Sequence, residues 1–168
     1  NVRGRMSIVD GNNKLHDFVK DAQNKGVIFD VGHGGGSFAF SQAIPAINQG
    51  LKPNTISTDL HTGSMNGGMK DLLNVMSKFL NMGLNLNEVI TSVTWDAAKS
   101  IKKENLGNLS VGSIADITIL NLREGDFGFI DTKNKKMNGT KKLECELTIK
   151  DGKIVYDLNG LASLKWDE

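Results

Sequence analysis

Two apolar, strand-like runs that each end in a polar loop constrain this chain more than any other feature. The first, residues 27–31, leads into a glycine-rich stretch from Gly32 to Ser37. The second, residues 55–58, leads into residues 59–61 (DLH). One helix-length segment separates the two runs, and this order of elements produces parallel strands in compact domains. Parallel strands joined in this way share a carboxyl edge, where α/β folds place their ligands. The sequence therefore predicts an α/β fold with a site at this edge.

The rest of the chain divides into a helical part and a strand-rich part. Apolar residues at helical spacing predict helices over 15–24, 38–48, 69–82, 87–93 and 95–102. After Gly107 the pattern changes, and strands are expected at 111–112, 116–120, 143–150 and 154–156. We therefore expect an α/β domain over residues 1–105 and a β domain over residues 106–168.

Some local details follow from the same reading. Ser37 is the expected N-cap of the second helix, and Pro45 inside that helix predicts a kink or a late start. Asp151 and Gly152 form a two-residue hairpin signal. Residues 27–31 are apolar almost throughout, which predicts a strand covered on both faces.

Composition excludes several classes of partner. The chain has 168 residues, enough for one domain or one and a part. Its 20 basic and 19 acidic residues give a net charge of +1, which argues against a nucleic-acid-binding surface. No apolar run approaches the length of a membrane span. The single cysteine cannot form an internal disulfide, and we expect a cytoplasmic protein.

The polar loops allow three interpretations. The glycines at 32 and 34, followed by a helix and by Asp59 after the next strand, fit a nucleotide- or phosphate-binding module that uses the loop from Gly32 to Ser37. Alternatively, His33, Asp59 and His61 are titratable groups gathered at one edge for hydrolysis, with Asp59 binding a metal and moving a proton. In the third, the side chains only stabilise turns and the glycines only permit tight bends. Because the neighbours of His33 are glycines, we do not expect other side chains to bury its ring.

Five segments, in this order, resemble one known family. They are residues 29–34 (FDVGHG), 56–61 (ISTDLH), 76–80 (MSKFL), 106–116 (LGNLSVGSIAD) and 147–153 (LTIKDGK). Together they resemble the amidohydrolase superfamily, and within it the dihydroorotase-like group of amidohydrolase/deacetylase proteins. The resemblance covers almost the whole chain.

The resemblance implies a metal-dependent (β/α)8 TIM barrel followed by a small β-sandwich. The strand that ends at Gly32 would be the seventh of the barrel. Asp59 matches the aspartate that ends the eighth strand, binds the metal and handles the proton of the attacking water. His33, with its neighbour Gly34, would face the substrate, and His61 lies where relatives can contact substrate. The implied cofactor is a divalent metal, expected to be zinc, with one or two ions in the complete enzyme.

The sequence also departs from the family pattern. It contains no His-x-His pair, and the bridging lysine or glutamate and the later histidine ligands of the family are absent. One carboxylate does not hold zinc, which takes three or four protein ligands. We therefore expect a C-terminal fragment, inactive alone, of a hydrolase that cleaves amide, cyclic amide or acyl ester bonds. Its expected partner is a small-molecule substrate, and the complete enzyme is expected to be a homo-oligomer.

Overall fold

The computed structural model describes residues 7–167 and shows an α/β arrangement. Strands β1 (Asp30–Gly32) and β2 (Thr55–Ser57) pair in parallel, with Val31 opposite Ile56. The carboxylate of Asp30 accepts hydrogen bonds from the hydroxyl groups of Thr55 and Ser57, at 2.7 and 2.9 Å. The predicted parallel pair is confirmed, and the loops after the two strands leave from the same edge.

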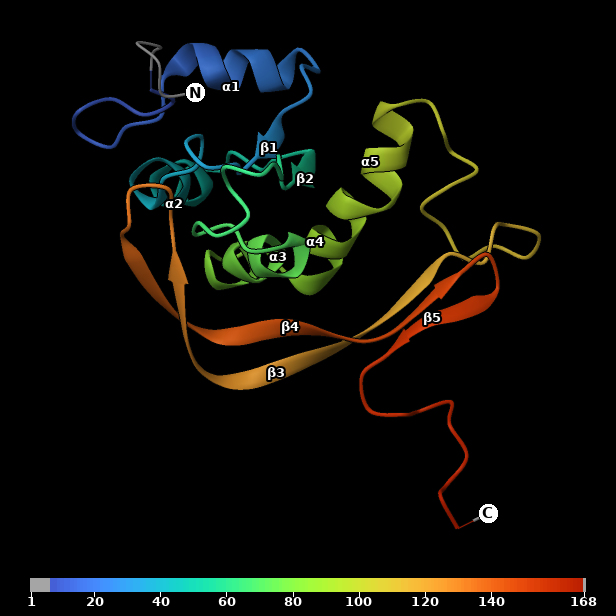
Figure 1. Ribbon diagram of the computed structural model, residues 1–168. Coiled ribbons are helices and arrows are strands. Elements are labelled where there is room, and N and C mark those ends of the chain that lie inside the picture. Colours follow the sequence, from blue (N-terminus) through green and yellow to red (C-terminus); the bar gives the residue numbers. More distant parts are fainter. Residues whose placement is uncertain (1–6, 168) are drawn as a thin grey trace.

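Within residues 7–167, five helices accompany this pair. They are α1 (Asp17–Asn24), α2 (Phe40–Asn48), α3 (Leu72–Asn81), α4 (Leu86–Val93) and α5 (Trp95–Ser100). In Figure 1, α3 lies between the parallel strands and the long antiparallel strands of the C-terminal half. None of the helices in the described part of the chain is both long and apolar enough to cross a membrane.

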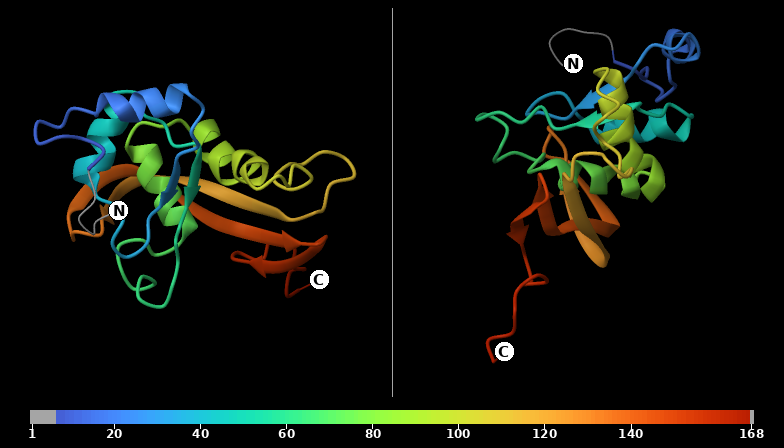
Figure 2. Two further views of the ribbon diagram at one scale, coloured as in Figure 1. Left: turned by 90° about the horizontal axis from the view of Figure 1, so that it is seen from above. Right: turned by 90° about the vertical axis from the view of Figure 1, so that its right-hand side faces the viewer.

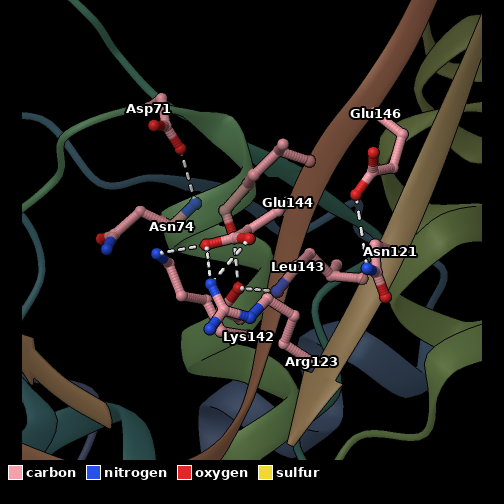
Figure 3. Close-up of polar contacts among 10 residues, drawn as sticks. Asp71, Asn74, Asn121, Arg123, Lys142, Leu143, Glu144 and Glu146 are labelled. Atoms are coloured by element: carbon pink, nitrogen blue, oxygen red, sulfur yellow. Dashed lines mark hydrogen bonds and ion pairs between the residues drawn. The ribbon is translucent and has the colours of Figure 1, made fainter. Parts of the chain in front are cut away.

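The starts of α3 and α4 have the expected local chemistry. The side chain of Asp71 accepts a hydrogen bond from the Asn74 amide at 2.7 Å and caps α3 (Figure 3). Asn85 and Glu88 form a reciprocal capping box at the start of α4.

The expected N-cap of α2 is wrong. The helix begins at Phe40 with Ala39 in the N-cap position, and Ser37 lies before it. The Phe40 amide donates instead to the carboxylate of Asp131, 91 residues further along the chain, at 3.0 Å. A sequence window around the helix cannot reveal a cap that arrives from so far away.

Three antiparallel strands form the second sheet: β3 (Ile117–Ile130), β4 (Lys136–Lys150) and β5 (Lys153–Asp157), in the order β3-β4-β5. The hairpin at Asp151 and Gly152 is confirmed, with φ values of 50° and 73°. The expected strand at 111–112 is absent, and β3 and β4 are much longer than expected. Figure 2 shows these strands as a layer on one side of the helices, with the C-terminal residues extending away from it.

Helix α3 docks on β4 through polar and apolar contacts. The hydroxyl of Ser77 accepts a hydrogen bond from the Leu143 amide at 2.9 Å. The side chain of Asn81 accepts from the Thr140 amide at 2.8 Å and donates to the Lys141 carbonyl at 2.7 Å. Next to Leu143 on β4, Glu144 accepts hydrogen bonds from Arg123 of β3 and from Lys142 (Figure 3).

One apolar core is shared by the two parts of the chain. It includes Ile56 of β2, Phe79 of α3, Val89 of α4, and Phe129 and Leu143 of the antiparallel strands. The division near residue 105 stays a prediction, because this core extends to both sides of it.

The expectation of a strand buried on both faces over residues 27–31 is wrong, because each of these residues is exposed or only half-buried. Val27 and Ile28 are 51% and 58% exposed, and β1 begins only at Asp30. Within the described residues, β1 has a neighbouring strand on one edge alone, so little packs against the residues that precede it.

Candidate active site

Asp59 lies at the strand edge where α/β folds place functional side chains. It follows β2 by two residues, at the carboxyl edge of the parallel pair. Its backbone is in the left-handed region, with φ of 49°, which an aspartate adopts more readily than most residues. The side chain is exposed, and its carboxylate has no hydrogen-bond or ion-pair partner among residues 7–167. Non-glycine residues held at positive φ occur at functional sites more often than elsewhere, which makes Asp59 a candidate site residue.

Gly34 lies directly against Asp59. The Gly34 amide donates to the Thr58 carbonyl at 2.8 Å, so the two loops are hydrogen-bonded to each other. The φ value of Gly34 is 51°, and a Cβ atom at this position would lie 2.5 Å from Oδ2 of Asp59. Only glycine permits this close approach, so Gly34 shapes the surroundings of the carboxylate through its backbone.

His33 is completely buried, which contradicts the expectation drawn from its glycine neighbours. Its ring is 0% exposed and stacks on Phe38 with ring centroids 4.5 Å apart. Nε2 lies 2.8 Å from Nζ of Lys78, and Nδ1 lies 3.0 Å from the Gly34 carbonyl oxygen. Because an ammonium group only donates, Nε2 accepts and the ring hydrogen sits on Nδ1. Both nitrogens are therefore occupied, and contact between this ring and a substrate stays a prediction.

His61 lies in the same loop as Asp59 and is exposed. Its Nδ1 accepts a hydrogen bond from the Gly63 amide at 3.1 Å, and its own amide donates to the hydroxyl of Ser64 at 3.0 Å. The buried Ser64 hydroxyl also donates to the Asp59 carbonyl at 3.4 Å. The loop after β2 is thus closed on itself, with Asp59 and His61 both open to solvent. A substrate contact by His61 remains untested.

Lys78 is a buried charged residue beside the candidate site that the sequence reasoning missed. It is 0% exposed, and its ammonium donates to His33, to the Gly68 carbonyl at 2.7 Å and to the Ile130 carbonyl at 2.8 Å. Burial lowers the pKa of Lys78 to about 8. A signal was present in the sequence: Lys78 lies three residues after Val75 and four before Met82, in the middle of a buried stripe of α3.

Asp131 is the second buried charge that the sequence did not reveal. It is 2% exposed, and its carboxylate accepts hydrogen bonds from the amides of Phe40, Lys133 and Lys135. Burial alone would raise the pKa of Asp131, but these amides hold it below the ordinary value. Asp131 therefore ties the β3–β4 turn to the start of α2.

The capping of α2 by Asp131 argues against a phosphate-binding site at the loop from Gly32 to Ser37. Such a site uses the free amides and the positive dipole end of the following helix. Here the Phe40 amide at that helix start is already bound by the carboxylate of Asp131. A negative side chain at this place repels a phosphate rather than binding it.

A sequence profile of the Amidohydrolase family matches residues 40–155, which is more than half of the chain. The chain belongs to the amidohydrolase family. It is 42% identical over 118 residues to a deacetylase of Brucella anthropi, covering 70% of this chain and 29% of that protein. It is 34% identical over 145 residues to a deacetylase of Enterococcus faecalis, covering 86% of this chain and 39% of that protein. This amidohydrolase chain therefore spans about a third of the length of these relatives.

Two solved structures resemble this amidohydrolase chain closely. A crystal structure of an adenine deaminase superposes with a TM-score of 0.84 at 34% identity, covering 90% of this chain and 41% of that one. A crystal structure of a dihydroorotase gives a TM-score of 0.76 at 32% identity, covering 84% of this chain and 39% of that one. The α/β fold of the described residues is thus shared with enzymes of this family.

The described residues of this amidohydrolase do not complete a metal site. No group of three or more His, Cys, Asp or Glu side chains that could hold a metal ion occurs among residues 7–167. The open carboxylate of Asp59 can supply one oxygen ligand, and the occupied nitrogens of His33 can supply none in this arrangement. Asp59 therefore fits as one ligand of a metal centre, but it does not form a metal site by itself.

The buried ring of His33 predicts a loss of stability in mild acid. Burial lowers the pKa of His33 from 6.5 to about 4, so between these values the unfolded chain binds more protons than the folded one. Its contribution to the free energy of unfolding is complete above pH 6.5 and is lost as the pH falls towards 4. At about 1.4 kcal/mol for each pKa unit, the full loss is up to about 3 kcal/mol.

Melting temperatures of the metal-free full-length protein at pH 7, 6 and 5 would measure this loss. His33→Phe keeps the ring stacking and should melt with a shallower pH dependence than the wild type. His16→Gln, which changes a half-buried histidine at the start of α1, should retain the wild-type slope. Equal slopes for all three proteins would show that His33 is not the group responsible.

Proposed function

We propose that this chain is the C-terminal part of a metal-dependent hydrolase that cleaves amide, cyclic amide or acyl ester bonds of a small molecule. In this proposal, β1 and β2 are the last two strands of a (β/α)8 barrel, and the antiparallel strands belong to an appended β-sandwich. The observation that carries the proposal is the exposed, unpaired carboxylate of Asp59 at the carboxyl end of β2. Membership of the amidohydrolase family supports a hydrolytic role for this carboxylate.

Asp59 is the proton carrier in the proposed mechanism. Its carboxylate accepts the proton of the attacking water and returns it to the leaving nitrogen or oxygen. A divalent metal bound beside it would lower the pKa of water and polarise the scissile carbonyl. The neighbouring Gly34 leaves space at Oδ2 of Asp59, so the carboxylate can approach both water and leaving group.

The names of the similar proteins indicate which kinds of bond the proposed enzyme hydrolyses. Two similar proteins are deacetylases, and the two similar solved structures are an adenine deaminase and a dihydroorotase. The names adenine deaminase and dihydroorotase denote hydrolysis at a carbon–nitrogen bond, and the name deacetylase is compatible with an amide or an ester. We therefore place amide and cyclic amide substrates before acyl esters, with zinc as the first metal to test.

The full-length protein that contains this chain provides the test. N-acetylated amino acids, a cyclic amide, an acyl ester and adenine would be assayed before and after metal removal. We expect hydrolysis of at least one of these substrates to fall more than 100-fold on chelation and to return with Zn²⁺. Residues 1–168 expressed alone should hydrolyse none of them, because the described residues supply only one candidate ligand. Activity that survives chelation, or activity of residues 1–168 alone, would contradict the proposal.

A further inference from the structure

The buried ammonium of Lys78 joins three segments that are distant in sequence. It donates to Nε2 of His33 in the loop after β1, to the carbonyl of Gly68 in the loop after β2, and to the carbonyl of Ile130 at the end of β3. These donor–acceptor distances lie between 2.7 and 2.8 Å. All three hydrogens of the ammonium are therefore used.

Two of these segments, the loops after β1 and after β2, contact or contain Asp59. His33 is followed by Gly34, whose backbone packs against the Asp59 carboxylate and is hydrogen-bonded to Thr58. Gly68 lies near the end of the loop between β2 and α3 that carries Asp59, and a Cβ atom at Gly68 would lie 2.3 Å from the Ile130 carbonyl oxygen. The ammonium thus fixes the loop that contacts Asp59 and the far end of the loop that carries it.

The attachment of α3 to β4 does not depend on the buried ammonium of Lys78. Ser77 and Asn81 already hydrogen-bond the helix to β4, and Val75 and Phe79 are fully buried beside them. A buried charge is costly, and an apolar side chain of similar volume often stabilises a core equally well. Two of the three acceptors around this buried donor lie in the loops after β1 and β2, which indicates a role in holding the geometry of those loops.

We propose that Lys78 is a positioning residue, which holds the loops after β1 and β2 in the arrangement that places Asp59 for catalysis. Lys78 does not touch the substrate and acts through His33, Gly34 and Gly68. The kinetic part of this proposal rests on the proposed hydrolase function.

The first experiment compares Lys78→Met with Asn81→Ala in the full-length, metal-loaded protein. Lys78→Met fills the same space but removes all three hydrogen bonds, and we expect kcat to fall about 10- to 100-fold with KM within threefold of wild type. Asn81→Ala removes hydrogen bonds between the same helix and β4 without touching the loops, so kcat should stay within twofold. Metal content should equal that of the wild type in both variants.

A second measurement does not depend on activity. Hydrogen exchange of backbone amides should accelerate at least tenfold over residues 33–37 and 59–68 in Lys78→Met. In Asn81→Ala the faster exchange should lie over residues 139–143 instead. If the wild type hydrolyses nothing, the proposed function fails, and this exchange pattern still decides the role of Lys78.

Two further variants keep the test decisive if Lys78→Met does not fold. His33→Phe removes one acceptor and keeps the stacking on Phe38, and it should reproduce the loss of kcat and the faster exchange over residues 59–68. Lys78→Arg keeps the charge and the donors, and it should retain more kcat than Lys78→Met. Unchanged loop exchange and wild-type kcat in folded Lys78→Met or His33→Phe would overturn the proposal, as would an equal loss of kcat in Asn81→Ala.

Discussion

Replacing Asp59 with asparagine should abolish hydrolysis by the full-length protein while the protein stays folded. Asparagine has nearly the same shape and tolerates the left-handed backbone with φ of 49°, so the loop should keep its form. The carboxylate has no partner among the described residues, so its loss should leave the melting temperature within about 2 °C. The amide is a poor base, and general-base assistance contributes roughly 10²–10⁴-fold to the rate. Steady-state kinetics at matched metal content would measure the decrease in kcat.

Asp71→Asn provides the matched control for this experiment. It makes the same change of charge at the other end of the same loop, and asparagine remains a good N-cap for α3. We expect its kcat to stay within threefold of wild type. If Asp59→Asn kept more than a tenth of wild-type kcat at equal metal content, the assignment of Asp59 as proton carrier would be wrong.

Replacing Gly34 with alanine should damage the site through Asp59. The new Cβ atom would lie 2.5 Å from Oδ2 and 3.3 Å from Cγ of Asp59, so the carboxylate must move. The φ value of 51° adds a backbone strain of about 1–2 kcal/mol for a residue with a side chain. Displacement of a catalytic group by about 1 Å can cost on the order of 10²-fold in rate, and we expect kcat to fall by 10- to 100-fold.

Gly36→Ala separates this effect from a general sensitivity of the loop. Gly36 lies two residues further on, and nothing would lie within 4 Å of a Cβ atom there. Its kcat should remain within twofold of wild type, and its melting temperature should change less than that of Gly34→Ala. Similar losses of kcat in both variants would mean that loop flexibility, and not contact with Asp59, controls the rate.

Local sequence patterns were sufficient to predict most of the helices and the sheet edge at which the candidate site lies. Periodic apolar residues located the helices, because a helix that covers a core must repeat its apolar face about every 3.6 residues. Neighbouring strands that are joined through a helix usually run parallel, so the sequence alone predicts that Asp59 and Gly34 lie at one edge. The hairpin at Asp151 and Gly152 followed from the backbone preferences of those two residues alone.

The surroundings of His33 could not be predicted from the sequence, because most of the groups that contact its ring are remote along the chain. Lys78 is 45 residues away, and its ammonium and the ring of Phe38 cover a histidine for which the neighbouring glycines predict an open environment. In the same way, the cap of α2 comes from Asp131, 91 residues beyond Phe40, and not from the nearby Ser37. Buried polar groups must find hydrogen-bond partners, but the partners are chosen by packing in three dimensions, which a local sequence pattern does not encode.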